Sequence, residues 1–496
     1  MRRTVHLILA AAVIVTLSCP PRRAPRHPGA AFTLAMEGEL LTLDPHLEDE
    51  SVTHSTLCNI YDPLVAFDPQ MRIAPALAAS WENPDELTWR FRLRPGVVFH
   101  HGAPFTAADV KYSLDRARGL GVGYYLGTVK EVKVIDDLTV DIITTKPSPV
   151  LLNKLTFIAI VPQWYAGLAA RPAGTGAYKF VSYQKGQSLL LAARASYWGG
   201  EPAIKNVVMR FIPAAAERAR ALAKGEVLLA RDITEANLEN AGPHNGITLA
   251  KSPSLAVSFL GVNFTRRSPL ASRAVREAIY WALDPQQLLA ENKLDAMPSD
   301  QFVSPYIVGY LPSDRARRPD LARAKKLLAA AGYPKGGVVN LEVTTVAMTK
   351  SGPVIVRQLG AAGIRVNLKP YEWPELSERL NKRQSQFFLV GWGCSSGDAS
   401  DLFDACLHTP DGKNYGQANW GGYSDRALDR LIEQSGSTLD NRQRIKLMHQ
   451  AMRMVSADLP LIPLYAKNRT YGYRDDVAFT PRQDGRIKLI EIGYRE

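Results

Sequence analysis

Residues 88–96 read Thr-Trp-Arg-Phe-Arg-Leu-Arg-Pro-Gly, and residues 106–109 read Thr-Ala-Ala-Asp. The first stretch alternates apolar with charged side chains, which is the period of a strand with one buried face, and it ends in a Pro-Gly turn. Thr106, followed three residues later by Asp109, resembles a capping box with Asp in place of Glu and predicts a helix over 107–118. A strand, a turn and a capped helix in succession indicate a mixed α/β fold.

The same signals recur along the chain. β-Branched and aromatic clusters bounded by Gly, Pro or Asp predict strands over 87–93, 129–134, 139–144, 207–212, 257–262, 338–345 and 387–390. Capping residues predict helices over 107–118, 273–283, 425–434 and 441–457, and one from Asp320 to Gly332. In that last helix we expect one apolar face made of Leu321, Ala324, Leu327, Leu328 and Ala331.

The length and the N-terminal residues indicate an exported protein with more than one lobe. A chain of 496 residues exceeds what one hydrophobic core usually organises. Residues 1–19 combine two arginines, a short apolar run and a small residue before Cys19, which predicts a signal peptide. Residues 20–30 are rich in proline and arginine and are expected to form a flexible linker. Cys19 is a candidate lipidation site; the alternative is ordinary signal cleavage before Phe32.

Charge and cysteine content exclude several classes. The formal net charge of +12 is scattered along the chain, without a dense basic run, so nucleic acid is not the expected partner. Four cysteines are too few for a disulfide scaffold. Cys394 and Cys406 are close enough in sequence to pair in an oxidising compartment, but spacing alone leaves that pairing open.

A series of motifs in a fixed order resembles the family-5 solute-binding proteins, which serve peptide, nickel, glutathione and related importers. The stretch from Ala78 to Ser113 is very similar to the signature of that family. Further matching pieces occur in the family's order and cover nearly the whole chain after the linker: 43–46, 174–180, 197–200, 263–284, 324–333, 363–366, 391–392, 422–429 and 460–465.

The resemblance implies an α/β, two-lobed clamp of the periplasmic-binding-protein type (class II, with an extra inserted subdomain). Lobe I is expected to comprise residues 31–60, 175–258 and 467–496, with the inserted subdomain at 61–174. Lobe II is expected over residues 259–466. The chain crossings between the lobes would form a hinge, and ligand would favour the closed form.

The resemblance also implies a function. A monomeric extracytoplasmic receptor, not an enzyme, would capture a peptide or peptide-like solute and deliver it to the membrane permease subunits of an ABC importer with separate ATPases. We expect no cofactor and no metal, because the adjacent His100 and His101 cannot complete a coordination shell. A nickel chelate, haem, an opine or glutathione is the alternative ligand.

Six residues are candidates for ligand contact. The family places Trp392 at the cleft, and Ser395 stands where peptide-binding relatives have an aspartate for the ligand's amino group. Because a neutral hydroxyl cannot pair with an ammonium, Asp398 or Asp49 would have to substitute. Lys350 lies near the position of an arginine that binds the ligand's carboxylate in dipeptide-binding relatives, and Asn419 is an intermediate candidate.

A serine hydrolase is the alternative enzyme reading. Residues 393–397 read Gly-Cys-Ser-Ser-Gly, which formally matches the nucleophile elbow, with Ser395 as the nucleophile. Neither His408 nor His449 has an evident role as its paired base. The sequence therefore favours a binding protein.

Overall fold

The computed structural model describes residues 31–163, 165–312, 318–413 and 415–495. The predicted signal peptide, the linker and Cys19 lie outside these residues. Among the residues that are described, no helix combines the length and the hydropathy that crossing a bilayer requires.

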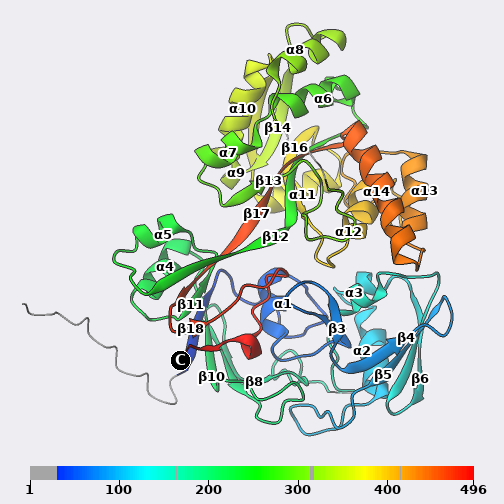
Figure 1. Cartoon of the computed structure of the whole chain (residues 1–496), viewed down its shortest axis with the longest axis vertical. Helices are drawn as coiled ribbons and strands as arrows, with labels where there is room; N and C mark the ends of the chain where they lie inside the picture. Colours follow the sequence, from blue (N-terminus) through cyan, green and yellow to red (C-terminus); the bar gives the residue numbers. More distant parts are fainter. Residues whose placement is uncertain (1–30, 164, 313–317, 414, 496) are drawn as a thin grey trace, which may run out of the picture.

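Two long antiparallel strands join two lobes (Figure 1). Strand β12 (Ile247–Val262) pairs with β17 (Leu461–Arg474) from Ile247 opposite Arg474 to Gly261 opposite Leu461. We call lobe I the part that holds β1 to β11 and the segment after β17, and lobe II the part between β12 and β17. The register shifts twice along the pair, between Pro253 and Val257 and between Ser258 and Phe259. Such irregularities bend a strand locally, so this ribbon is where the lobes can move relative to each other.

The ribbon lies in the middle of one sheet of 11 strands that extends into both lobes. On the lobe I side, β17 is followed across the sheet by β11 (Leu229–Arg231), β1 (Phe32–Met36), β10 (Asn206–Phe211), β9 (Ser188–Ala193) and β8 (Tyr178–Gln184). On the lobe II side follow β16 (Phe387–Gly393), β14 (Val338–Thr344) and β15 (Arg365–Tyr371), while β13 (Ala296–Pro298) pairs with β17.

Residues 88–96 and 106–109 belong to a separate small layer within lobe I. Strand β5 (Thr88–Leu93) lies in a four-stranded sheet with β4 (Ala78–Glu82), β7 (Thr139–Thr144) and β6 (Val129–Asp136). Helix α2 (Ala107–Ala117) buries Val110 and Leu114 in the same hydrophobic core as this sheet. The backbone N–H of Thr106 donates to Asp109 Oδ2 at 2.9 Å, which confirms the predicted capping. The predicted domain boundaries themselves stay a prediction.

In lobe II, helices cover both faces of the sheet. The side chains of Phe387 and Leu389 enter one core and those of Phe388 and Val390 the other, as alternation in a strand requires. One core is shared with α6 (Arg273–Ala282), α7 (Pro285–Glu291), α8 (Leu321–Ala330) and α10 (Ser351–Ala361). The other is shared with α11 (Trp373–Asn381), α13 (Arg426–Ser435) and α14 (Asn441–Asp458).

Helix α8 begins as predicted, but fewer residues of its apolar face are buried than the face contains. Asp320 Oδ1 accepts the N–H of Arg323 at 2.8 Å. Ala324 and Leu328 are buried, whereas Leu321 is exposed, so the buried part of this apolar face does not include Leu321. Leu321 is the first residue of the helix.

Candidate functional site

The lobes touch where the segment after β16 reaches lobe I. Asn153 in α3 (Leu151–Leu155) donates from Nδ2 to the carbonyl oxygen of Ser396 at 2.8 Å. Lys146 Nζ lies 2.7 Å from the Tyr415 hydroxyl oxygen and 5.1 Å from the centre of that ring. Gly397 has a φ of +73°, and a Cβ built there would be 3.0 Å from Met71 Cε in lobe I. The segment 394–398 therefore forms part of the surface between the lobes.

Strand β16 changes from buried to partly exposed as it approaches this surface. Up to Val390 it is buried, but the glycines 391 and 393 and the next odd residue, Ser395, are exposed. On one side the strand pairs with β12 over 387–393, while its pairing with β14 is the single position Glu342 opposite Phe388. An exposed, side-chain-free strand edge can accept an extended ligand backbone.

Trp392 lies on this strand and is half-buried against lobe II. Its ring packs edge-on against Trp420, with 6.2 Å between ring centres. Its indole Nε1 is buried and has no hydrogen-bond partner among the described residues. A buried N–H without an acceptor is unfavourable, so this group favours a ligand or solvent acceptor nearby.

Both lobes place carboxylates near the contact between them. On lobe I, Asp49 accepts hydrogen bonds from the hydroxyls of Tyr124 and Tyr125, the latter at 2.7 Å. Burial raises the pKa of Tyr124, with Asp49 and then Asp401 of lobe II contributing further. Asp49 is hydrogen-bonded to this hydroxyl, and Asp401 of the other lobe influences its pKa only through its charge.

Two of these acids titrate near neutral pH. Burial raises the pKa of Asp401 to about 6, against the opposing effect of the N–H of Ser396, which donates to Oδ2 at 2.9 Å. Burial also raises the pKa of Asp404 to about 6, against the opposing effects of Lys154 and Lys146. An acid with a raised pKa is less favourable when charged, so Asp401 and Asp404 lower the stability of the folded chain above pH 6.

The structure brings three of the six candidate ligand residues to the surface between the lobes and places the other three elsewhere. Trp392, Ser395 and Asp49 lie at or beside it. Lys350 is exposed at the junction of α9 (Thr345–Thr349) and α10, with no ion pair among the described residues. Nothing in the structure links Lys350 to the other five.

Asp398 and Asn419 have partners inside lobe II. Asp398, 2% exposed, receives both terminal nitrogens of Arg444 at 2.7 Å. Asn419 Nδ2 donates to the carbonyl oxygens of His408 and Tyr423, and its Oδ1 accepts the N–H of Tyr423. These side chains fix the shape of the segments that carry Ser395 and Trp420, and their polar atoms are already engaged.

The sequence analysis did not single out Asp401, Asp404, Tyr124, Lys146 or Lys154. Asp401 follows Ser395 closely and was within reach of sequence reasoning. The remaining four come from segments whose proximity to β16 only the fold reveals.

The geometry at Ser395 lacks the features of a hydrolase. His408 lies 2.7 Å from the carbonyl oxygen of Thr409 through Nδ1 and 3.2 Å from Glu433 through Nε2, and its ring stacks on Tyr415. His449 contacts the carbonyl oxygen of Tyr310. Among the described residues no histidine bonds to Ser395, and the left-handed residue of the turn is Gly397 rather than the serine. The arrangement suits binding better than nucleophilic attack.

The cysteines 394 and 406 and the histidines 100 and 101 lie in well-defined surroundings. Cys394 and Cys406 are free and buried, so the disulfide that the sequence left open is not formed. Burial lowers the pKa of His100 to about 4, and its Nε2 lies 2.9 Å from the carbonyl oxygen of Gly176. The ring of His101 stacks between those of Phe99 and Tyr165.

Comparisons with known proteins agree with this geometry. Residues 72–414 match the family model described as bacterial extracellular solute-binding proteins, family 5. The chain is 28% identical to Di/tripeptide-binding protein 2 of Pseudomonas aeruginosa, over 87% of this chain and 89% of that one. It is 27% identical to Heme-binding protein A of Haemophilus influenzae, over 94% of each. The structure of DppA from Helicobacter pylori in complex with the peptide STSA superposes with a TM-score of 0.78 at 25% identity, over 94% of this chain and 98% of that one.

The ion pair between Asp398 and Arg444 should be important for stability. Replacing Asp398 with alanine leaves a buried guanidinium unpaired, and we expect a loss of about 3–5 kcal/mol in the free energy of unfolding. Unfolding by guanidinium chloride, followed by tryptophan fluorescence, measures this loss of stability. As a control, Lys111→Ala breaks the exposed pair with Asp115 and should cost less than about 1 kcal/mol. Equal effects of the two substitutions would contradict this role of Asp398.

A second expectation concerns pH. Because the folded-state pKa values of Asp401 and Asp404 lie above the unfolded value, their contribution to stability is greatest below pH 4 and declines until about pH 6. The double substitution Asp401→Asn with Asp404→Asn removes this decline. The difference in Tm between variant and wild type should therefore be larger at pH 7.5 than at pH 4.5. A difference that does not change with pH would show that these acids are not desolvated.

Proposed function

The chain belongs to family 5 of the bacterial extracellular solute-binding proteins, and from this we propose that it captures a peptide or peptide-like solute between its lobes for an ABC importer. The observation that carries the proposal is the exposed edge of β16 at residues 391–395, beside Trp392 and at the contact between the lobes. A peptide laid along this edge exchanges main-chain hydrogen bonds with it, and the indole covers one of its side chains.

The ribbon supports a closing mechanism. Lobe II is connected to lobe I through β12 and β17, so a small change at their register shifts moves one lobe over the other. A ligand that touches both lobes binds the closed form better and shifts the population towards it. The permease subunits of the importer, driven by separate ATPases, would recognise that closed form.

We further propose that Asp49 and Asp401 receive the positively charged end of the ligand. Asp398 is engaged with Arg444, and Ser395 is neutral, whereas Asp49 and Asp401 belong to opposite lobes near their contact. A ligand ammonium between them would stabilise the charged carboxylates and join the lobes. A nickel chelate, haem, an opine or glutathione remains the alternative class of ligand.

The proposal places the mature protein outside the cytoplasm as a monomer without enzymatic activity. The motif before Cys19 supports export, followed either by lipidation of Cys19 or by cleavage before Phe32. Mass spectrometry of the mature N-terminus distinguishes these two outcomes.

Calorimetry with di-, tri- and oligopeptides, N-blocked peptides, glutathione, opines, haem and nickel chelates should identify one saturable class of ligand. Trp392→Ala should weaken that binding at least tenfold, or by about 1.4 kcal/mol, because the aromatic contact is lost. The matched control is Trp373→Ala in the same lobe, whose indole is 50% exposed and should not contribute. No binding across the whole panel, or equal losses for both variants, would refute the proposal.

The alternative hydrolase is tested separately. Purified protein should not turn over activated esters or peptides above the background rate, since Ser395 has no histidine partner. If turnover is measured and Ser395→Ala abolishes it, the protein is an enzyme and the receptor proposal fails in its present form.

A further inference from the structure

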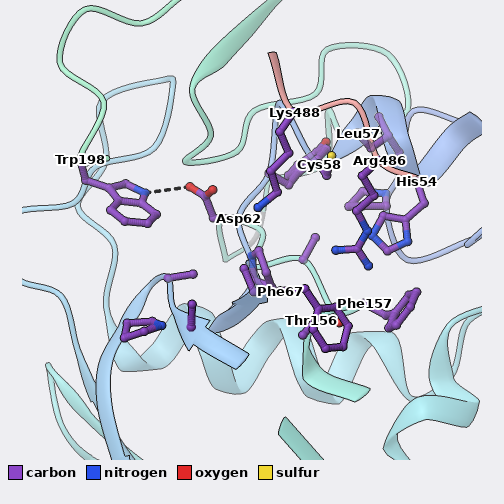
Figure 2. Close-up of a pocket in the computed structure, with 18 of the residues that line it drawn as sticks. His54, Leu57, Cys58, Asp62, Phe67, Thr156, Phe157, Trp198, Arg486 and Lys488 are labelled. Carbon is purple, nitrogen blue, oxygen red and sulfur yellow. Dashed lines mark hydrogen bonds between the residues drawn. The ribbon is translucent and has the colours of Figure 1, made fainter. Parts of the chain in front are cut away.

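Lobe I contains a cavity of ≈ 180 Å³ whose lining comes from lobe I alone (Figure 2). Its walls come from α1 (Ser51–Leu57) and the residues just after it, from the hairpin of β2 (Val65–Phe67) and β3 (Ile73–Pro75), from residues 156–159 and 197–198, and from the C-terminal segment 486–488. All lining residues precede residue 199 or follow residue 485. Binding in this cavity therefore requires no contribution from lobe II.

One wall carries a buried guanidinium that lacks a close partner. Arg486 is 7% exposed, and its nearest carboxylate oxygen is Asp484 Oδ2, 3.9 Å from Nε. That oxygen already accepts a hydrogen bond from Arg482 Nη2 at 2.8 Å. The terminal nitrogens of Arg486 make no hydrogen bond with any residue that the structure describes, and they are not among its fully buried unpaired polar atoms. A buried guanidinium normally has a carboxylate or phosphate partner, so this one lacks part of its complement.

A second cation stands beside it. Lys488 lines the same cavity, and its ammonium forms no ion pair within the described part of the chain. Burial lowers the pKa of Lys488, and the neighbouring Arg482 and Arg486 lower it further. Figure 2 shows the side chain extending from the C-terminal segment towards the side of the cavity where Asp62 lies.

Asp62, on the opposite wall, accepts its hydrogen bonds from uncharged donors. Its carboxylate accepts hydrogen bonds from the hydroxyls of Thr175 at 2.9 Å and Tyr197 at 3.0 Å, and from the indole N–H of Trp198 at 2.9 Å. Burial raises the pKa of Asp62, and the charge of Lys488 opposes this effect, although the two side chains form no ion pair among the described residues. Arg486 therefore stays available to an anion, Lys488 would be shared between that anion and Asp62, and Asp62 disfavours a second negative charge at the far end.

The rest of the lining mixes aromatic and small apolar side chains with polar ones, which include the carboxylate of Glu48 and the hydroxyl of Thr156. Phe157 has the Arg486 guanidinium over its ring at 5.0 Å and the His54 ring edge-on at 5.0 Å. Phe67 contributes another aromatic wall, while Ala66 and Ala74 leave room between them. An apolar cavity of about 150 Å³ is sufficient for a benzene ring. The cavity therefore has space for one ring and a small polar group.

We propose that this cavity binds a small aromatic monocarboxylate, with the carboxylate on Arg486 and Lys488 and the ring beside Phe67, because Tyr125 and Arg486 already cover the Phe157 ring. The planar guanidinium fits the two carboxylate oxygens, and the ammonium adds a second charge-assisted hydrogen bond. A cationic ligand of the same shape is excluded, because it would place like charges together in a buried space.

Benzoate is the probe, and benzylamine is its match in shape with the opposite charge. Ligand-observed NMR titration of the full chain should give saturable binding of benzoate and none of benzylamine. Lys488→Met keeps the aliphatic stem but removes the charge and should weaken benzoate binding at least fivefold. Ala74→Leu fills the cavity without changing any charge and should abolish the binding.

Two controls separate this site from the surface between the lobes. Lys130→Met removes an exposed lysine of lobe I and should leave benzoate binding unchanged. Trp392→Ala should also leave it unchanged, even where it weakens the solute that lobe closure captures. The inference is overturned if benzoate does not bind, if benzylamine binds equally well, if Lys488→Met and Ala74→Leu have no effect, or if Trp392→Ala removes the binding.

Discussion

The antiparallel pairing of β12 with β17 is the constraint on which the rest of this structure depends. The two strands share hydrogen bonds over most of their length, and both lobes attach their own strands to this pair. A two-stranded ribbon resists stretching but bends where its ladder is interrupted, and here the interruptions lie between residues 253 and 259. Rigid lobes on a bendable connection follow from this geometry, and a surface for ligand follows from the way the lobes meet.

The segment after β16 shows how a rigid support and an exposed edge occur together. Asp398 fixes the segment to α14 through Arg444, and Asp401 accepts the N–H of Ser396. Between the buried part of β16 and these anchors, Gly391, Gly393 and Ser395 stay exposed. Asp398, which was a candidate for ligand contact, thus holds the backbone of this segment in place through its pair with Arg444.

Much of the fold could be predicted from the sequence, because the signals were local. The capped helices α2 and α14 and the strands β5, β7 and β16 depend on periodicity and on capping within a few residues. The first half of β12 was missed, since residues 247–256 lack a clear alternation and become a strand only by pairing with β17. The candidate site was only partly predictable, because Asp398 finds Arg444, and the charge of Asp401 acts on Tyr124, through distant segments that the fold brings together.

The order of strands in the central sheet has a consequence for how the newly made chain folds. Lobe II is one uninterrupted stretch between β12 and β17, whereas in lobe I β11 lies next to β17, which is made almost half a chain later. Lobe II can therefore assemble from neighbouring segments as they leave the export channel, while the sheet of lobe I stays open at β11 until residues 471–473 arrive. Until then β11, paired with β1 on one side, exposes its other edge, and an exposed strand edge favours aggregation or chaperone binding.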